Sequence, residues 1–180
     1  MRMLATCIAL AGLLGAASLW RFGFTWTLLP YLAYSGLSAV LIVIDLLSKR
    51  LPNALTLPAI PATAALLALP ALADDQAAAL IRALCAGGVL LAVYLALHLM
   101  APAGLGLGDV KLAASLGMVL GWLSWSALLG GAALGFVIGA LVSLGLLAAR
   151  RANRRSDVPF GPSMLAGGWL VILASGLAPG

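Results

Sequence analysis

Two aspartates stand out as residues that could do chemistry in a chain with only five acidic side chains. Asp45 follows the apolar run 39–44, and Asp109 follows the glycine-rich segment 104–108. An ionisable side chain at membrane depth is costly and marks a candidate functional site. Two carboxylates that lie close together share a proton. Such a pair can hydrolyse an amide, because one carboxylate takes a proton from water while the other donates one to the carbonyl oxygen.

The other three acidic residues have ordinary explanations. Asp74 and Asp75 lie between two apolar segments, where a solvated charge is expected. Asp157 lies beside Arg154 and Arg155, which is typical of a surface ion pair. None of the three is a candidate for chemistry.

Asp45 and Asp109 also have possible structural roles. Asp45 precedes Lys49 by four residues, the spacing of an ion pair on one helix face, and Asp109 could cap the start of a helix. The segment Gly106-Leu107-Gly108-Asp109-Val110-Lys111 favours a functional role. Glycines allow unusual backbone angles and the close approach of another chain. A phosphate-binding role for these glycines is excluded, because the acid that follows them would repel the ligand.

The composition indicates that the natural solvent of the chain is a lipid bilayer. Hydrophobic residues make up 64% of the 180 residues, charged residues 8%, and the mean hydropathy is +1.16. A soluble domain carries about 25% charged residues. The net charge of +5 does not indicate nucleic acid, because four of the ten basic residues lie in the short stretch 150–155. Such clusters mark cytoplasmic loops of membrane proteins.

The apolar segments predict an all-α integral membrane protein with six to seven transmembrane helices in a single domain, residues 1–180. A spanning helix needs about 20 mostly apolar residues. The segment 110–120 is too short to cross alone, which leaves six spans as an alternative. The glycine spacing Gly135-Phe-Val-Ile-Gly139 is typical of close helix packing in lipid. The expected helices are 3–20, 27–47, 54–72, 77–100, 110–120, 125–149 and 163–177.

The charges predict the orientation of these helices. With a cytoplasmic N-terminus, eight basic residues fall on the inner side, and only Arg21 and Arg82 fall on the outer side. Positive charge collects on the cytoplasmic side of membrane proteins. This orientation brings Asp45 and Asp109 to the same level, near the cytoplasmic face.

No metal or cofactor is expected. Cys7 and Cys85 lie in apolar runs without the paired spacing of a metal site or a disulfide framework. His98 is the only other titratable side chain well inside a span, and a packed or interfacial role is expected for it.

Three segments resemble the type IV prepilin peptidase family of GxGD aspartic membrane proteases. They are the block from Asp45 to Pro58, the block from Gly106 to Leu112, and Pro159-Phe160-Gly161-Pro162. The resemblance implies that Asp45 and Asp109 are the catalytic pair of an endopeptidase. It would remove the leader from pilin or pseudopilin precursors, typically after a glycine, at the cytoplasmic face of a bacterial inner membrane. Residues implied to support the site or bind substrate are Gly106, Gly108, Lys111, Pro52, Asn53, Pro159 and Gly161.

The same resemblance limits the expected activity to proteolysis. Longer family members carry a cytosolic domain with paired cysteine motifs and also N-methylate the product, whereas this sequence contains no such motif. The precursor and the bilayer are the expected partners, and the sequence does not indicate an oligomeric state.

Three other functions remain as alternatives. One is a presenilin-like GxGD protease, against which Lys111 and the block from Asp45 to Pro52 favour the prepilin class. Another is a small transporter or proton relay that uses both aspartates, which would have polar residues spread toward the membrane midplane. The third is a structural membrane subunit.

Overall fold

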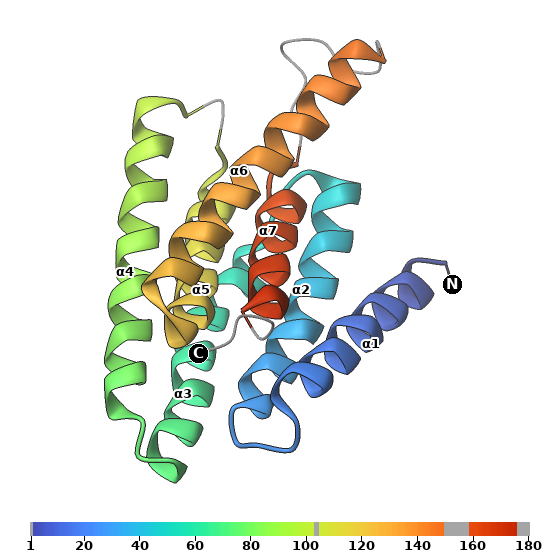
Figure 1. The fold of residues 1–180 in the computed structure, drawn as a ribbon. Helices are drawn as coiled ribbons and strands as arrows, with labels where there is room; N and C mark the ends of the chain where they lie inside the picture. The colour runs from blue at the N-terminus through green and yellow to red at the C-terminus, as the bar shows by residue number, and fades with distance from the viewer. Residues whose placement is uncertain (1, 103–104, 150–158, 176–180) are drawn as a thin grey trace.

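The protein folds into a bundle of helices (Figure 1). The computed structural model describes residues 2–102, 105–149 and 159–175, and these residues form seven helices and no strand. The predicted all-α fold is confirmed. The expected helix 110–120 is longer than predicted, and residues 176 and 177 of the last expected helix lie outside the described residues. The helices are α1 (Arg2–Phe22), α2 (Leu28–Ser48), α3 (Asn53–Ala73), α4 (Ala77–Met100), α5 (Leu107–Leu123), α6 (Trp125–Ala148) and α7 (Gly161–Ala174).

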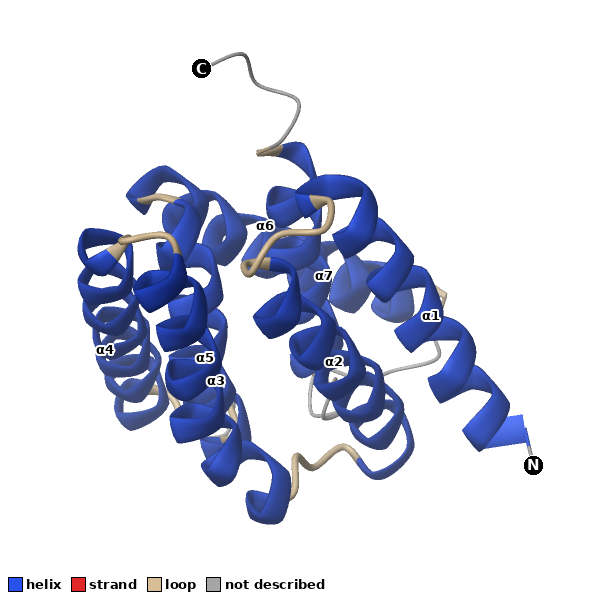
Figure 2. Cartoon of the chain, turned by 90° about the horizontal axis from the view of Figure 1, so that it is seen from below, coloured by secondary structure: helices blue, strands red, loops and turns tan. Residues whose placement is uncertain are grey.

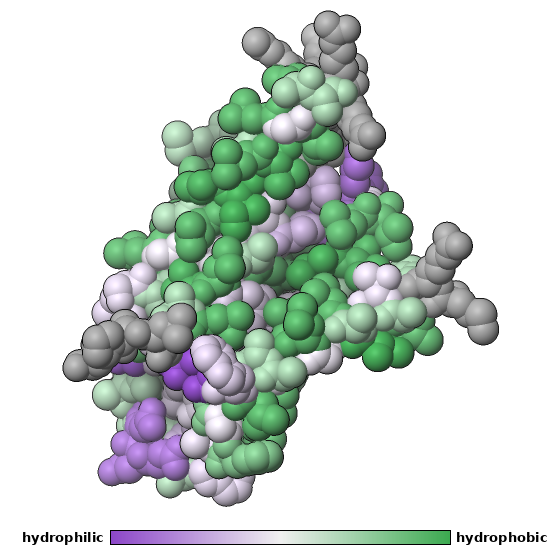
Figure 3. Space-filling view, turned by 45° about the vertical axis from the view of Figure 1, so that its right-hand side comes forward, coloured by the Kyte–Doolittle hydropathy of each residue, from purple (hydrophilic) through white to green (hydrophobic). Residues whose placement is uncertain are grey.

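Most of these helices are long and apolar enough to cross a bilayer. Five of the described helices, α1 to α4 and α6, meet that condition, and α7 is a shorter apolar helix. Large hydrophobic side chains such as Phe24, Leu72 and Met100 are exposed. In the space-filling view, hydrophobic residues cover most of the visible face, and hydrophilic residues gather near its two ends (Figure 3). The chain is therefore a multi-pass membrane protein.

Helix α5 lies at the centre of the bundle. It contacts α3, α4, α6 and α7, and almost all of its side chains from Asp109 to Trp122 are buried. Seen from below, α3, α4 and α5 lie together on one side, and α1 and α2 lie on the other (Figure 2). At 1.5 Å per residue, α5 is about 25 Å long, shorter than the hydrocarbon core of about 30 Å. Because protein surrounds it, α5 does not need the length of a lipid-facing span.

Small residues bring the helices close together. A Cβ atom added to Gly117 of α5 would lie 2.7 Å from the carbonyl oxygen of Ala86 in α4. Between α6 and α7, a Cβ atom added to Gly167 would lie 2.7 Å from the Cα of Gly135. A Cβ atom on Gly139 would lie 2.8 Å from the Phe160 ring. The packing role predicted for the spacing of Gly135 and Gly139 is therefore confirmed.

Polar side chains fix the junction between α5 and α6. The Arg82 guanidinium of α4 donates hydrogen bonds to the carbonyl oxygens of Gly121, Trp122 and Leu123 at the end of α5. A cation there satisfies carbonyl groups that have no partner within the helix and complements the helix dipole. Ser124 then caps α6, because its Oγ accepts a hydrogen bond of 3.0 Å from the backbone N–H of Ala127.

Candidate active site

The two aspartates predicted to form a pair meet at one end of the bundle. Asp45 lies in the last turn of α2 and Asp109 in the first turn of α5. The first residue of α7, Gly161, lies beside both of them. These three helix ends share the upper end of the bundle (Figure 1). Only 4% of Asp45 and 8% of Asp109 are exposed, so both carboxylates are buried.

Backbone N–H groups hold one oxygen of each carboxylate. The N–H of Gly161 donates to Oδ2 of Asp45 at 3.1 Å, and the N–H of Gly106 donates to Oδ2 of Asp109 at 3.2 Å. Helix N-termini favour negative charge, because their first N–H groups have no partner within the helix. Asp109 is therefore not the N-cap of α5, which is Gly106, but its carboxylate, in the first turn, accepts the N–H of that N-cap residue. Its Oδ1, however, is buried without a hydrogen bond from any described residue, and this oxygen is free for chemistry.

Both carboxylates border one small space beside Gly161. A Cβ atom added to Gly161 would lie 2.8 Å from Oδ2 of Asp45 and 3.5 Å from Oδ1 of Asp109. Oδ2 of Asp45 and Oδ1 of Asp109 are therefore separated by no more than the sum of these two distances. A side chain at position 161 would occupy the space that the two carboxylates share.

Leu51 closes another side of the same space. It lies in the short connection between α2 and α3, where Lys49 adopts a left-handed backbone with φ of 54° and ends α2. A Cβ atom added to Gly108 would lie 2.7 Å from the Cβ of Leu51, and one added to Gly161 would lie 3.4 Å from its Cδ1. The leucine side chain therefore extends between the starts of α5 and α7. Lys49 does not continue the helix of Asp45, so the structure gives no support to an ion pair along that helix.

The glycines before Asp109 act through close approach rather than through unusual backbone angles. Gly106 has φ of −74°, an extended conformation open to any residue. Among the described glycines, only Gly23 has a positive φ. Gly108 instead leaves room for Leu51. The structure thus gives no support to unusual backbone angles at Gly106, and it shows a close approach within this chain; the predicted approach of another chain stays a prediction.

A hydrogen bond joins the two sequence blocks that carry the aspartates. The Lys111 ammonium of α5 donates to Oδ1 of Asn53, the first residue of α3, at 2.6 Å. Pro52 precedes Asn53 in an extended conformation, and its carbonyl oxygen accepts the N–H of Thr56 in the first turn of α3. The structure thus brings the predicted residues Pro52, Asn53 and Lys111 together at the site end of the bundle.

An aromatic cluster fixes the start of α7. Pro159 and Phe160 are half-buried just before Gly161. The Phe160 ring packs on Tyr94 of α4 and Phe136 of α6, with ring centroids 6.2 and 5.2 Å away. Sequence reasoning missed Tyr94 and Leu51, because one aromatic and one leucine among so many apolar residues give no signal of their own.

His98 stabilises the connection between α4 and α5. Its half-buried ring donates from Nδ1 to the carbonyl oxygen of Leu105 at 2.6 Å, because a carbonyl oxygen can only accept. This structural contact agrees with the packed or interfacial role expected for His98.

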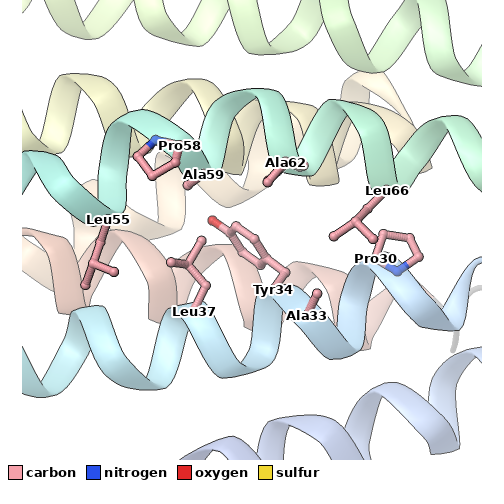
Figure 4. A pocket seen from close by; sticks show the side chains of 10 residues that line it. Pro30, Ala33, Tyr34, Leu37, Leu55, Pro58, Ala59, Ala62 and Leu66 are labelled. Carbon is pink, nitrogen blue, oxygen red and sulfur yellow. The ribbon is translucent and has the colours of Figure 1, made fainter.

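An apolar groove of about 250 Å³ runs between α2 and α3 (Figure 4). It extends from Pro30 and Leu66 to Leu37 and Leu55, and Leu55 lies in the first turn of α3, four residues after Leu51. Tyr34 lies in this groove, buried, and its hydroxyl makes no hydrogen bond of normal geometry with any described residue. The groove therefore offers a mainly apolar surface, in which Tyr34 and Thr63 are the polar side chains.

The fold and the site define a class of protein: a helical multi-pass membrane protein with a buried pair of carboxylates at one end of its bundle. A model of the Type IV leader peptidase family matches residues 31–146. That segment contains both Asp45 and Asp109 and ends before Pro159. The chain belongs to the Type IV leader peptidase family.

Individual relatives support this assignment. The chain is 33% identical over 149 residues to a prepilin leader peptidase/N-methyltransferase of Aeromonas hydrophila, covering 82% of this chain and 50% of that protein. It is 31% identical over 166 residues to the protein of that name from Xanthomonas campestris pv. campestris, and the match covers 90% of this chain and 55% of that protein. It is 32% identical over 153 residues to the prepilin leader peptidase/N-methyltransferase of Bacillus subtilis, and the match covers 85% of this chain and 58% of that protein. The chain thus spans about half the length of these relatives. No solved structure matches it.

Proposed function

We propose that this protein is an aspartic endopeptidase that removes the leader from type IV prepilin-like precursors, with Asp45 and Asp109 as its catalytic pair. The observation that carries the proposal is the convergence of both buried carboxylates on one space beside Gly161. Membership of the Type IV leader peptidase family and the printed names of the relatives supply the reaction and the substrate class.

The mechanism follows from the two carboxylates sharing one proton. The ionised aspartate takes a proton from water as the water attacks the scissile carbonyl carbon. The protonated aspartate donates its proton to the carbonyl oxygen, which gives a tetrahedral intermediate with two hydroxyl groups. In its collapse, the first aspartate passes the proton it took from water to the leaving nitrogen, and one hydroxyl returns its proton to the second aspartate as the carbon–nitrogen bond breaks. The N–H groups of Gly161 and Gly106 each occupy one carboxylate oxygen, which orients the pair. The unpartnered Oδ1 of Asp109 faces the reaction space.

The remaining predicted residues position this pair. Lys111 and Asn53 tie the start of α5 to the start of α3. Gly108 admits Leu51, Pro52 starts α3, and Pro159 leads into the residues that begin α7.

The site faces the cytoplasm in the proposed orientation, and the membrane is a bacterial inner membrane. Lys49, Arg50 and Lys111 belong to the end of the bundle that carries the aspartates, whereas Arg21 and Arg82 belong to the opposite end, together with Asp74 and Asp75. The excess of positive charge at the aspartate end supports a cytoplasmic location. A precursor could then keep its apolar segment in the bilayer while its leader reaches the site from the cytoplasm.

The transporter alternative is less well supported. A proton relay needs polar groups distributed toward the midplane. Here both candidate carboxylates lie at one end of the bundle, and the His98 ring is hydrogen-bonded to the backbone carbonyl of Leu105.

The test of function is co-expression with a prepilin in a bacterial strain that lacks its own leader peptidase. The expected result is removal of the leader, scored on a gel, with the new N-terminus mapped by mass spectrometry next to a glycine. Full-length precursor with this protein present in the membrane would contradict the proposal, provided that a curated relative processes the same precursor under the same conditions.

A further inference from the structure

Leu51 borders the reaction space from the connection between α2 and α3. Its Cβ crowds Gly108, the residue directly before Asp109, and its Cδ1 lies 3.4 Å from the position of a Cβ atom on Gly161. That same position is 2.8 Å from Oδ2 of Asp45 and 3.5 Å from Oδ1 of Asp109. The leucine side chain and the two carboxylates therefore line one space.

This space has little room for a further side chain. Gly161 borders it, and one added carbon there would lie 2.8 Å from Oδ2 of Asp45; Gly108 packs directly on Leu51, where an added carbon would lie 2.7 Å from the leucine Cβ. Because Cδ1 of Leu51 lies 3.4 Å from the position that both carboxylates approach, a peptide bond placed between the carboxylates would have Leu51 within contact distance. Packed protein interiors do not absorb extra volume without strain, and one misplaced methylene already costs free energy.

We propose that Leu51 sets the size limit on the residue next to the scissile bond, so that only a very small side chain is accepted there. The inference rests on the proposed function and adds to it a residue that determines specificity. Leu51 is half-buried and packs against the core. It can therefore form a wall of fixed position that the substrate meets as it enters.

The experiment compares two versions of one prepilin, with glycine or alanine as the last residue of the leader. Initial cleavage rates are measured for the wild type, Leu51→Val and Leu51→Ala in the same membranes. We expect the wild type to favour the glycine substrate strongly. The rate ratio of the alanine substrate to the glycine substrate should rise from the wild type through Leu51→Val to Leu51→Ala. The total rise should be at least about tenfold, since a pocket discriminates one methylene by about 10- to 200-fold.

Two controls separate size selection from a loss of folding. Leu47→Ala alters an exposed leucine of the same region and should leave the ratio unchanged. Leu51→Met conserves volume and should do the same. A ratio of rates for two substrates is independent of how much protein is folded, so partial unfolding of a variant does not imitate the effect.

The outcomes distinguish the inference from the proposed function. An unchanged ratio in both Leu51→Val and Leu51→Ala, with the glycine substrate cleaved by the wild type, would overturn the role of Leu51 and leave the peptidase intact. Failure of the wild type to cleave the glycine substrate would overturn the proposed function and this inference together.

Discussion

The backbone N–H of Gly161 donates a hydrogen bond of 3.1 Å to Oδ2 of Asp45, although 116 residues separate the two in sequence. This contact places the start of α7 against the end of α2. Because Gly161 has no side chain, it also leaves open the space between Asp45 and Asp109. A glycine at this position therefore both orients one carboxylate and makes room for substrate.

Replacing Gly161 by alanine should abolish activity without unfolding the protein. The new methyl group would lie 2.8 Å from Oδ2 of Asp45, in the space that both carboxylates border. Misplacement of reacting groups by about 1 Å costs about 100-fold in rate, so we expect a loss of at least about that size in leader cleavage. The matched control is Gly36→Ala in α2, where an added Cβ meets nothing within 4 Å. Gly161→Ala with wild-type activity would contradict the proposed geometry.

The effects of substituting Lys111 and Asn53 on the cleavage rate should not be additive, because the two residues share one hydrogen bond. Lys111→Met and Asn53→Leu each remove the contact of 2.6 Å. A hydrogen bond contributes about 0.5–1.5 kcal/mol, so we expect each variant to lose about 2- to 10-fold in cleavage rate. Once one partner is missing, the second substitution should add little. Losses that multiply in the double variant would show that the two residues act independently.

Adjacent glycines of α4 should differ in their effect on stability. A Cβ atom on Gly87 would lie 2.6 Å from the Met118 side chain and 2.9 Å from the Ala114 carbonyl oxygen, whereas Gly88 has nothing within 4 Å. Gly87→Ala should therefore destabilise the protein by about 1–3 kcal/mol through overpacking. Gly88→Ala should be neutral or stabilising, because alanine favours the helix. Thermal unfolding in detergent measures both, and equal effects would contradict the observed packing of α4 on α5.

Cysteine labelling should reveal which end of the bundle faces the cytoplasm. In a variant with Cys7 and Cys85 replaced by alanine, single cysteines are introduced at the exposed positions Arg50 and Asp74. We expect a membrane-impermeant maleimide to label the cysteine at 74 in intact spheroplasts and the cysteine at 50 only after permeabilisation. The reverse pattern would put the aspartate pair on the outer side.

The sequence predicted the helices and the aspartate pair for identifiable reasons. Length and hydropathy determine a membrane span, so the bounds of α2, α3 and α4 agree with the predicted ranges to within one residue. Two predicted spans, 54–72 and 77–100, separate Asp45 from Asp109. Because the chain crosses the membrane and returns between them, both aspartates were predicted at the same end of the bundle. The short apolar run after Asp109 predicted a helix too short to cross alone; α5 extends from Leu107 to Leu123, and its burial by the surrounding helices was not predicted.

Contacts between distant segments were beyond the reach of sequence reasoning. Gly161 was predicted only as a supporting residue, because its proximity to Asp45 depends on how α7 packs between α2 and α6. Leu51 is one of many leucines in the chain, and Tyr94 is one of several aromatic residues within apolar segments. Their importance comes from contacts with Gly108 and Phe160, which form only in the packed bundle.

The most direct test of the central claim replaces the two carboxylates by their near-isosteric amides. Leader cleavage is measured for Asp45→Asn, Asp109→Asn, the double variant and the exposed control Asp74→Asn, at matched levels of folded protein in the membrane. Because the pair acts as one unit, each single variant should lose at least about 100-fold, and the double variant should lose little more. Asp74→Asn should retain full activity. Cleavage that persists at the wild-type rate in either Asp45→Asn or Asp109→Asn would contradict the two-aspartate mechanism.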